Sequence, residues 1–524
     1  MAAARRPNVL FIITDQHRAD HTGFMGNSVV RTPNLDSLAA RGTVFESAWV
    51  SNPICMPNRC TIMTGRMPSN HGVIFNDRSL EWTANTHVRS FRAAGYRTAL
   101  LGKSHLQHGM SRNSMMPRSS APSIVAPYPE GWDGYENDEL YWDDEPDFPD
   151  DFYGFGRVEL SIDHGARVSG HHYRWAVERG ADPEHLRVPQ TADNPMRRGG
   201  DVWWQVYDPP YDEEHHSTSF VADRTIDFIE QASAEGSPWL AWASFPDPHH
   251  PFTPPGRWYD RHQPDDMELP ATFDDPLEGA PEYLKAFQER TVHKMRNWVA
   301  MTGATSPEVT RAAIAANYGS IEMIDDRVGQ ILATIERLGQ TDDTIVVFTA
   351  DHGDMMGDHG LLLKGFMHYR GTLQVPMVVV DPRREAGRTA SLASSIDLGP
   401  TLLDLAGLDP YHGIQGHSLV PLMADPAASV RDTVLIEDDL DVPLEVAPMA
   451  TSIRTLITPT HRYTRYNTGE DGLYELGTAD DERTNLAPTE PLLRAQHIEQ
   501  LADALIDHTE KSRFAPLLGA AGGA

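Results

Sequence analysis

The chain has 524 residues, too many for one ordinary core and suited to a large domain with a smaller companion. Its 44 Lys and Arg against 75 Asp and Glu give a formal charge of -31, which disfavours nonspecific binding to nucleic acid or to anionic membrane surfaces. No stretch approaches the roughly 20 apolar residues of a membrane span, and the first apolar run, 9–13, lacks the length of a signal sequence. We therefore expect a cytoplasmic protein, and its two cysteines suggest no disulfide framework.

The first predicted element is a strand over residues 9–13. A continuous apolar run of this kind is typical of a strand buried on both faces of a parallel sheet. It leads into Thr14, Asp15 and Gln16. Because α/β proteins bind ligands at the carboxyl ends of their strands, Asp15 is a candidate metal ligand. The alternative is an Asp that caps a helix.

Cys55 lies in the pattern Cys55-x-Pro57-x-Arg59, followed by Thr64 and Gly65. Pro57 fixes its own φ and biases the residue before it away from the helical region, so we expect the thiol at a rigid turn just before a helix. Arg59 then falls in the first helical turn, close to the thiol. The alternative is a buried structural cysteine. The pattern resembles the signature of the type I sulfatases, in which this Cys is oxidised to formylglycine.

The resemblance recurs from residue 8 to about 422 and is weakest between about 106 and 211. It implies a formylglycine-dependent sulfatase of the alkaline phosphatase superfamily, close to bacterial arylsulfatases and phosphonate monoester hydrolases. The implied fold is α/β, with a large, mostly parallel sheet sandwiched by helices. We assign this catalytic domain to 1–410, with an insertion at about 106–211. A smaller α+β domain at 411–524 would carry a short antiparallel sheet and a terminal helix.

Two polar residues near these motifs are further candidates. The sulfatases place a second acidic metal ligand where this chain has Gln16, which still offers an oxygen but removes one negative charge. Asn76 follows the turn at 70–72 and is a candidate substrate-contacting amide. The alternative for Asn76 is an ordinary turn residue.

A second buried strand is predicted at 96–101, and Lys103 and His105 follow it. Residues two apart project to the same side of an extended chain. The resemblance to the sulfatase Gly-Lys-x-His element implies that Lys103 binds a sulfate oxygen and that His105 touches the formylglycine. The pair favours sulfate, since phosphonate monoester hydrolases carry other residues here. The alternative is a solvated Lys and a surface His.

Residues 106–211 contain no motif that we can assign. Within them, 130–153 holds eleven acidic side chains and no Lys or Arg, interleaved with Trp, Tyr and Phe. That is too aromatic for ordinary disorder. We interpret it as an insertion packed on the domain, where it shapes the substrate pocket or an oligomer contact; a solvated acidic loop is the alternative.

A helix at 219–234 precedes a strand at 239–245, which ends in the run 246–252. The sulfatases have a Pro-His-x-Pro element at this point, and the match implies that His249 is the active-site imidazole. Without it, histidines between prolines in a loop would be unremarkable.

The clearest predicted helix covers 314–338, and the strand at 344–349 delivers Asp351 and His352. Asp351 and His352 follow the carboxyl end of their strand, as Asp15 follows the strand at 9–13. We therefore expect both strand ends to converge on one cation. The sulfatases most often carry Asn where this chain has His352. An imidazole moves the preference from hard cations such as Ca²⁺ toward Mn²⁺ or Zn²⁺. The resemblance further places Lys364 at the second sulfate-binding lysine.

Short strands are predicted at 433–437, 452–458 and 461–466, a terminal helix at 490–512, and a small-residue tail at 515–524 that is frayed or forms a subunit contact in a homo-oligomer.

With these features, the resemblance implies an arylsulfatase-like hydrolase of small sulfate monoesters, aryl or small alkyl. The nucleophile would be a formylglycine made from Cys55 by a formylglycine-generating enzyme. It would bind one divalent metal ion together with Asp15, Gln16, Asp351 and His352. The alternatives are a phosphonate monoester or phosphodiester hydrolase on the same scaffold, and a non-catalytic anion-binding protein with an unmodified Cys55.

Overall fold

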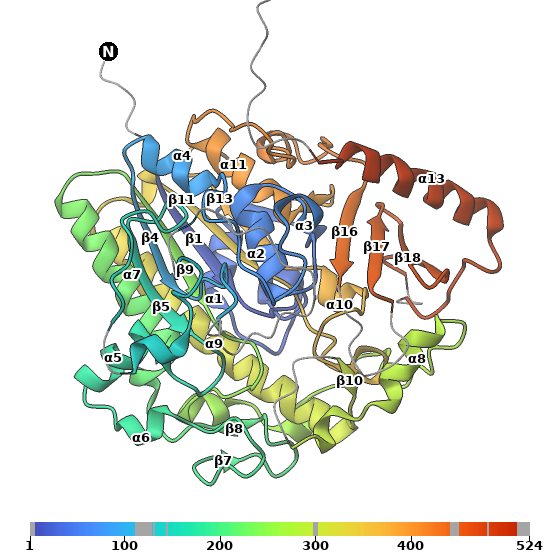
Figure 1. The fold of residues 1–524 in the computed structure, drawn as a ribbon, viewed down its shortest axis with the longest axis horizontal. Helices are drawn as coiled ribbons and strands as arrows, with labels where there is room; N and C mark the ends of the chain where they lie inside the picture. Colours follow the sequence, from blue (N-terminus) through green and yellow to red (C-terminus); the bar gives the residue numbers. More distant parts are fainter. Residues whose placement is uncertain are drawn as a thin grey trace, which may run out of the picture.

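The computed structural model describes residues 6–109, 128, 131–142, 145–296, 302–440, 450–478 and 482–510. Within them the centre is a nine-stranded sheet in the order β14-β2-β13-β11-β1-β9-β4-β5-β6 (Figure 1). Its middle strands run parallel: β11 (Thr344–Ala350), β1 (Asn8–Thr14), β9 (Trp239–Phe245), β4 (Arg97–Gly102) and β5 (Arg157–Ile162). β2 (Thr43–Phe45) pairs parallel to β14 (Gly387–Thr389), while β13 (Met377–Val380) and β6 (Ser169–Gly170) are antiparallel to their neighbours. The predicted mostly parallel α/β sheet is confirmed.

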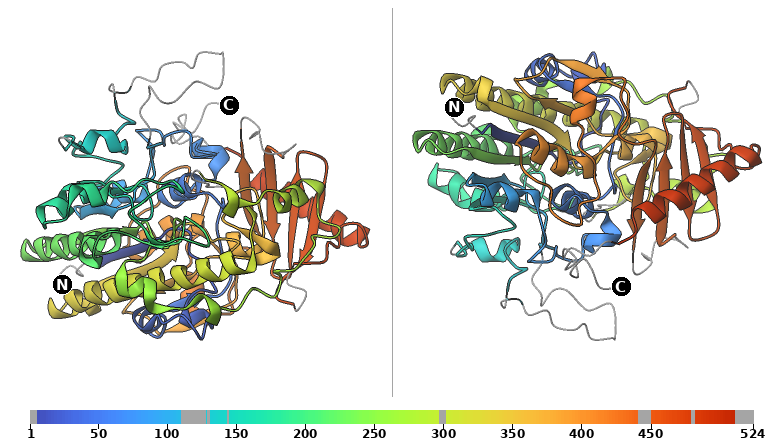
Figure 2. Two further views of the ribbon diagram at one scale, coloured as in Figure 1. Left: turned by 90° about the horizontal axis from the view of Figure 1, so that it is seen from below. Right: turned by 90° about the horizontal axis from the view of Figure 1, so that it is seen from above.

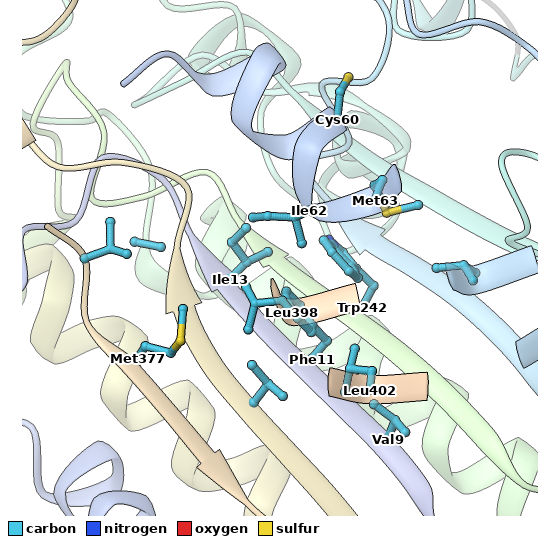
Figure 3. Packing of buried hydrophobic residues seen from close by; sticks show 14 of the residues in the cluster. Val9, Phe11, Ile13, Cys60, Ile62, Met63, Trp242, Met377, Leu398 and Leu402 are labelled. Carbon is cyan, nitrogen blue, oxygen red and sulfur yellow. The ribbon is translucent and has the colours of Figure 1, made fainter. Parts of the chain in front are cut away.

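The apolar runs form the middle strands because both faces of the sheet are covered. Every residue of β1, β9 and β11 is buried. Residues 10 and 12 of β1 pack toward α1 (Pro33–Ala39), α5 (His171–Glu178), α7 (Ser217–Ala234) and α9 (Pro307–Arg337). Residues 9, 11 and 13 pack toward α2 (Cys55–Thr64), α4 (His87–Ala93) and α11 (Leu398–Leu405). In Figure 3, Phe11 stacks on Trp242 with ring centroids 4.0 Å apart beneath Ile62 and Leu398.

Helix α9 begins seven residues earlier than predicted. Ser306 caps it by accepting a hydrogen bond from the Val309 backbone N–H, and Pro307 occupies the first turn, where its missing N–H costs nothing. The helix ends at Arg337, shortly before Gly339, which has φ 67°.

Residues 106–211 add strands to the sheet itself. β5 continues the parallel array beside β4, and α5 and α6 (Pro183–Leu186) follow it. In the acidic aromatic stretch, Tyr141, Phe152 and Tyr153 are fully buried. Where it is described, this stretch is packed on the domain.

The described C-terminal part forms a four-stranded antiparallel sheet of β16 (Val434–Asp439), β17 (Ser452–Ile457), β18 (His461–Tyr466) and β19 (Asp471–Glu475), of which β19 was not predicted. With α13 (Pro491–Asp507) it makes up one end of the molecule (Figure 2). Val434 and Ile436 join the same core as α2, so the two parts share apolar packing. The division at residue 410 stays a prediction. Residues 511–512 of the predicted helix and the tail 515–524 lie outside the described residues.

The shorter elements are α3 (Pro68–His71), α8 (Glu282–Glu289), α10 (Arg370–Leu373), α12 (Val420–Ala424), β3 (Ala48–Trp49), β7 (Arg198–Gly199), β8 (Tyr207–Asp208), β10 (Gly303–Ala304), β12 (Leu361–Leu362) and β15 (Ala393–Ser394). In the part of the chain that the structure describes, we find no helix with the length and apolarity to cross a bilayer.

Candidate active site

The predicted polar residues gather at the carboxyl edge of the sheet. Asp15 directly follows β1, Asp351 follows β11, and Lys103 follows β4. Because these strands are parallel neighbours, their carboxyl ends meet at one edge. Cys55 is the first residue of α2, a helix buried along its whole length against this sheet. Chain segments far apart in sequence thus meet at the N-terminus of α2.

Four buried side chains form a cluster able to hold a metal ion. Asp15, Cys55, Asp351 and His352 each offer one ligand atom, and these atoms lie within 4.8 Å of one another. His352 Nε2 is 3.1 Å from Cys55 Sγ and 3.6 Å from an oxygen of each carboxylate. The Asp351 carboxylate raises the pKa of His352 against the opposing effect of burial.

Gln16 reaches this cluster through its backbone. Its N–H donates to Asp351 Oδ1 at 3.0 Å, at a left-handed φ of 58°. Its side-chain amide instead contacts Asp354 and the His250 ring, whose Nδ1 is 3.1 Å from Nε2. A role for the Gln16 side chain as a metal ligand stays a prediction.

Cationic side chains surround the cluster. Arg59 donates from Nε to Asp351 Oδ2 at 2.7 Å, Lys103 donates to Asp15, and Lys364 Nζ lies 3.9 Å from Asp15 Oδ1. Burial raises the pKa of the Asp15 carboxyl, but these cations hold it well below its usual range. The site therefore keeps the buried Asp15 carboxylate ionised, as metal binding requires.

The Cys55 thiol is 1% exposed and lies 3.0 Å from Lys364 Nζ, which donates to it. Burial and Asp15 raise the pKa of the thiol, but Lys103, Lys364 and His352 outweigh them, so the net pKa lies below the usual value. Burial raises the pKa of the Cys60 thiol, one and a half turns further along α2, well above it. The two thiols thus differ in acidity, and Cys55 is the more acidic.

The remaining predicted residues line the same region. Asn76 accepts the Met56 backbone N–H at 3.1 Å through Oδ1 and so caps the start of α2; contact with substrate stays a prediction. His249 is buried and stacks on His250, with centroids 4.2 Å apart. His105 has a left-handed φ of 55°. Burial lowers the pKa of both His249 and His105 well below the usual value, and neighbouring cationic groups lower it further.

Comparison with known proteins identifies the family to which this chain belongs. The family profile for sulfatases matches residues 7–408, which is most of the chain. The chain belongs to the sulfatase family. This family acts on esters as hydrolases and is part of the alkaline phosphatase superfamily. A second profile, for the C-terminal region of N-sulphoglucosamine sulphohydrolase, matches residues 357–485.

Individual relatives of this sulfatase family member match four fifths of its length or more. An arylsulfatase of Clostridium perfringens is 28% identical, over 96% of this chain and 95% of its own. A choline-sulfatase of Rhizobium meliloti is 26% identical over 80% of this chain and 72% of its own. Among solved structures, the phosphonate monoester hydrolase of Agrobacterium radiobacter superposes with a TM-score of 0.75 at 26% identity, covering 96% of both chains.

Sequence reasoning missed three residues of this site. Asn58 donates from Nδ2 to the Asp351 carbonyl at 2.6 Å and accepts from Ser395 Oγ at 2.7 Å, bracing α2 against β11. Glu136 accepts backbone N–H groups from the loop after β4. His164 stacks on His249. Asn58 lies inside the Cys55 motif and could have been noticed there, whereas Glu136 and His164 come from 106–211 and carry no recognisable signal.

Proposed function

We propose that this protein hydrolyses sulfate monoesters, aryl or small alkyl, through a formylglycine formed from Cys55. One observation supports this most directly: Cys55 starts α2 inside a buried cluster of carboxylate and imidazole ligands, with Lys364 3.0 Å from its side chain. A structural cysteine needs no such surroundings. The similarity to an arylsulfatase over 96% of the chain supports the same substrate class.

The cluster suits one divalent cation. Its donors are two carboxylates, an imidazole and the side chain at position 55, all buried, which fits Mn²⁺ and, with the Gln16 oxygen, Ca²⁺; Zn²⁺ also accepts this set. When bound, such an ion would lower the pKa of a hydroxyl on the modified residue 55.

The chain's own residues would perform the remaining tasks. The hydrated aldehyde of formylglycine would supply one hydroxyl to attack sulfur and a second whose deprotonation expels sulfate. Arg59, Lys103 and Lys364 can balance charge on the sulfuryl oxygens. His249, with Lys364, would protonate the departing oxygen, and His105 would accept the proton of the second hydroxyl. The low pKa of His105 suits a base that is neutral before it accepts that proton.

The test is the mass of the peptide that carries Cys55. Trypsin cuts after Arg41, Arg59 and Arg66, so Cys55 and Cys60 fall in separate peptides, and the second serves as an internal control. The protein is expressed with and without a formylglycine-generating enzyme. We expect only the Cys55 peptide to become lighter, by the change from CH2SH to CHO, and aryl sulfate hydrolysis to rise with the converted fraction. An unmodified thiol under both conditions would favour a non-catalytic anion-binding protein.

A second candidate is hydrolysis of phosphonate monoesters or phosphodiesters. The structural match to a phosphonate monoester hydrolase favours it. The pair Lys103 and His105 favours sulfate, and Lys103 donates to the Asp15 carboxylate at the site. The ratio of kcat/KM on a matched aryl sulfate and aryl phosphonate, measured on fully converted enzyme, distinguishes the two.

A further inference from the structure

His164 lies directly beside the candidate catalytic groups although it comes from the unassigned segment 106–211. Its ring stacks on His249 with centroids 3.8 Å apart and an interplanar angle of 23°. His249 stacks in turn on His250, so the imidazoles form a column with His249 in the middle. The ring plane of His249 is therefore fixed from both sides.

The same His164 ring holds Lys103. Nζ of Lys103 donates to His164 Nε2 at 2.5 Å and also donates to Asp15. An ammonium aimed between an imidazole nitrogen and a carboxylate has a defined direction, which a long flexible side chain otherwise lacks. One residue thus touches both the candidate proton donor and a candidate sulfate-binding cation.

The backbone around His164 is built for this approach. The residue follows β5, whose carboxyl end lies at the same edge of the sheet as that of β4. Asp163, just before it, adopts a left-handed φ of 75°, a strained conformation for a residue other than Gly. Gly165, just after it, has φ 60°, and a Cβ there would meet the Pro251 carbonyl oxygen at 2.8 Å. The loop at 163–165 can lie against the His249 loop only with glycine at 165.

A metal ion is the other interpretation of this cluster. Asp15, His164 and His249 offer ligand atoms within 4.8 Å of one another. The Lys103 ammonium, however, is bonded to both Asp15 and His164, and it supplies the positive charge there. The arrangement therefore suits a held ammonium better than a second cation.

We propose that His164 is a positioning residue that aligns His249 for proton donation through ring stacking and directs Lys103 toward the sulfuryl group through its hydrogen bond. The inference rests on the proposed hydrolysis for its kinetic readout. It assigns a function to the segment 106–211: the segment completes the active site.

Two substitutions separate the two contacts. His164→Phe keeps a ring for stacking but removes the acceptor, whereas His164→Gln keeps an acceptor but removes the stack. Phenyl sulfate has a poorer leaving group than 4-nitrophenyl sulfate and depends more on protonation. We expect His164→Gln to lower kcat/KM for phenyl sulfate about tenfold or more, while kcat/KM for 4-nitrophenyl sulfate changes less than about threefold. A misplaced general acid slows most the ester whose leaving group depends on protonation. In a His249→Ala background it should change this ratio little.

His164→Phe should show the opposite pattern. The leaving-group ratio should stay near that of the wild type, while inorganic sulfate, measured by calorimetry, binds about tenfold more weakly because Lys103 loses a charge-assisted hydrogen bond. Gly165→Ala should reproduce both defects. His171→Gln is the control, because His171 lies in the same segment but contacts Leu160 and Tyr141 instead.

The proposal is overturned if both esters slow equally in His164→Gln and sulfate binding is unchanged in His164→Phe. It is also overturned if metal analysis finds two ions per wild-type chain and one in His164→Phe, which would make His164 a ligand. If converted wild-type enzyme cleaves aryl phosphonates instead, the proposed sulfate specificity fails and the same leaving-group comparison is made with phosphonates. If it cleaves neither ester, the proposed function fails, and sulfate binding alone decides the role of His164.

Discussion

Glu136 gives the sharpest test of how the active-site loop after β4 is held. Its Oε2 accepts the His105 N–H at 2.8 Å, and its Oε1 accepts those of Leu106 and Gln107, each at 2.9 Å. In Glu136→Gln the amide oxygen can keep two of these bonds, but its NH2 group then faces the third donor. Burial raises the pKa of Glu136, so removing the charge also relieves a desolvation cost.

The expected loss of loop stability follows from the one hydrogen bond that Glu136→Gln cannot keep. One charge-assisted bond contributes about 1.5–3 kcal/mol, and part of it is offset by the relieved desolvation, which leaves about 1–2 kcal/mol. Local opening of the loop should then become roughly 5–30 times more frequent. Hydrogen exchange of a peptide spanning 103–108, read by mass spectrometry, measures this directly. We expect kcat to fall with it, because the loop carries Lys103 and His105.

Glu139→Gln is the matched control, since Glu139 belongs to the same acidic stretch but is exposed. Exchange in that peptide should be unchanged in the control. If Glu136→Gln exchanges at the wild-type rate as well, the carboxylate does not hold the loop, and the reasoning is refuted.

Three further predictions concern the metal, acid stability and packing. Asp351→Asn should reduce bound metal to less than about a tenth and destabilise the protein by about 1.5–3 kcal/mol, because the buried Arg59 loses a charge-assisted hydrogen bond and keeps the longer ion pair with Asp15; full metal content by elemental analysis would contradict this. Burial lowers the pKa of His172 to about 3, so on acidification the unfolded state takes up a proton before the folded state does. The neutral His172 therefore contributes fully to the free energy of unfolding above pH 6.5, and this contribution should fall by about 1.4 kcal/mol per pH unit below pH 6.5. Denaturant unfolding between pH 6.5 and 4.5 should be less steep in pH for His172→Gln, and an equal slope would speak against the assignment. Gly102→Ala should give little folded protein, because a Cβ at φ 110° would lie 1.9 Å from the Ser244 carbonyl oxygen; a soluble variant with wild-type thermal unfolding would refute the close contact.

The sequence predicted the central strands well because buried parallel strands leave a local signal. The run at 9–13 is continuously apolar and those at 239–245 and 344–349 are mostly apolar, and they became adjacent strands β1, β9 and β11. Each ends in polar residues at the edge where ligands bind, so Asp15 and Asp351 could be paired from the sequence alone. The Cys55 motif added a local pattern that a helix start explains.

The contacts from 106–211 could not be predicted in this way. Glu136 and His164 act through partners that the fold brings to them, and nothing in their neighbouring residues marks a buried carboxylate or a stacked imidazole. Strand β5 was missed because its residues alternate between buried and partly exposed positions at the sheet's margin. A short alternating run of this kind carries less signal than a continuous apolar one.

The hydrogen bonds between β16 and the turn before Cys55 can form only late in the synthesis of the chain. Glu437 N–H donates to the Ser51 carbonyl at 2.9 Å, and Asn52 Nδ2 donates to the Glu437 carbonyl at 2.6 Å. Glu437 is synthesised about 380 residues after Cys55, and because ribosomes add roughly 5–20 residues per second, about 20–80 s separate the two. For that interval the turn lacks the strand that covers it. The time available to an enzyme that oxidises Cys55 while the turn is uncovered is thus set by the rate of translation. Slower synthesis of the C-terminal strands should therefore raise the converted fraction.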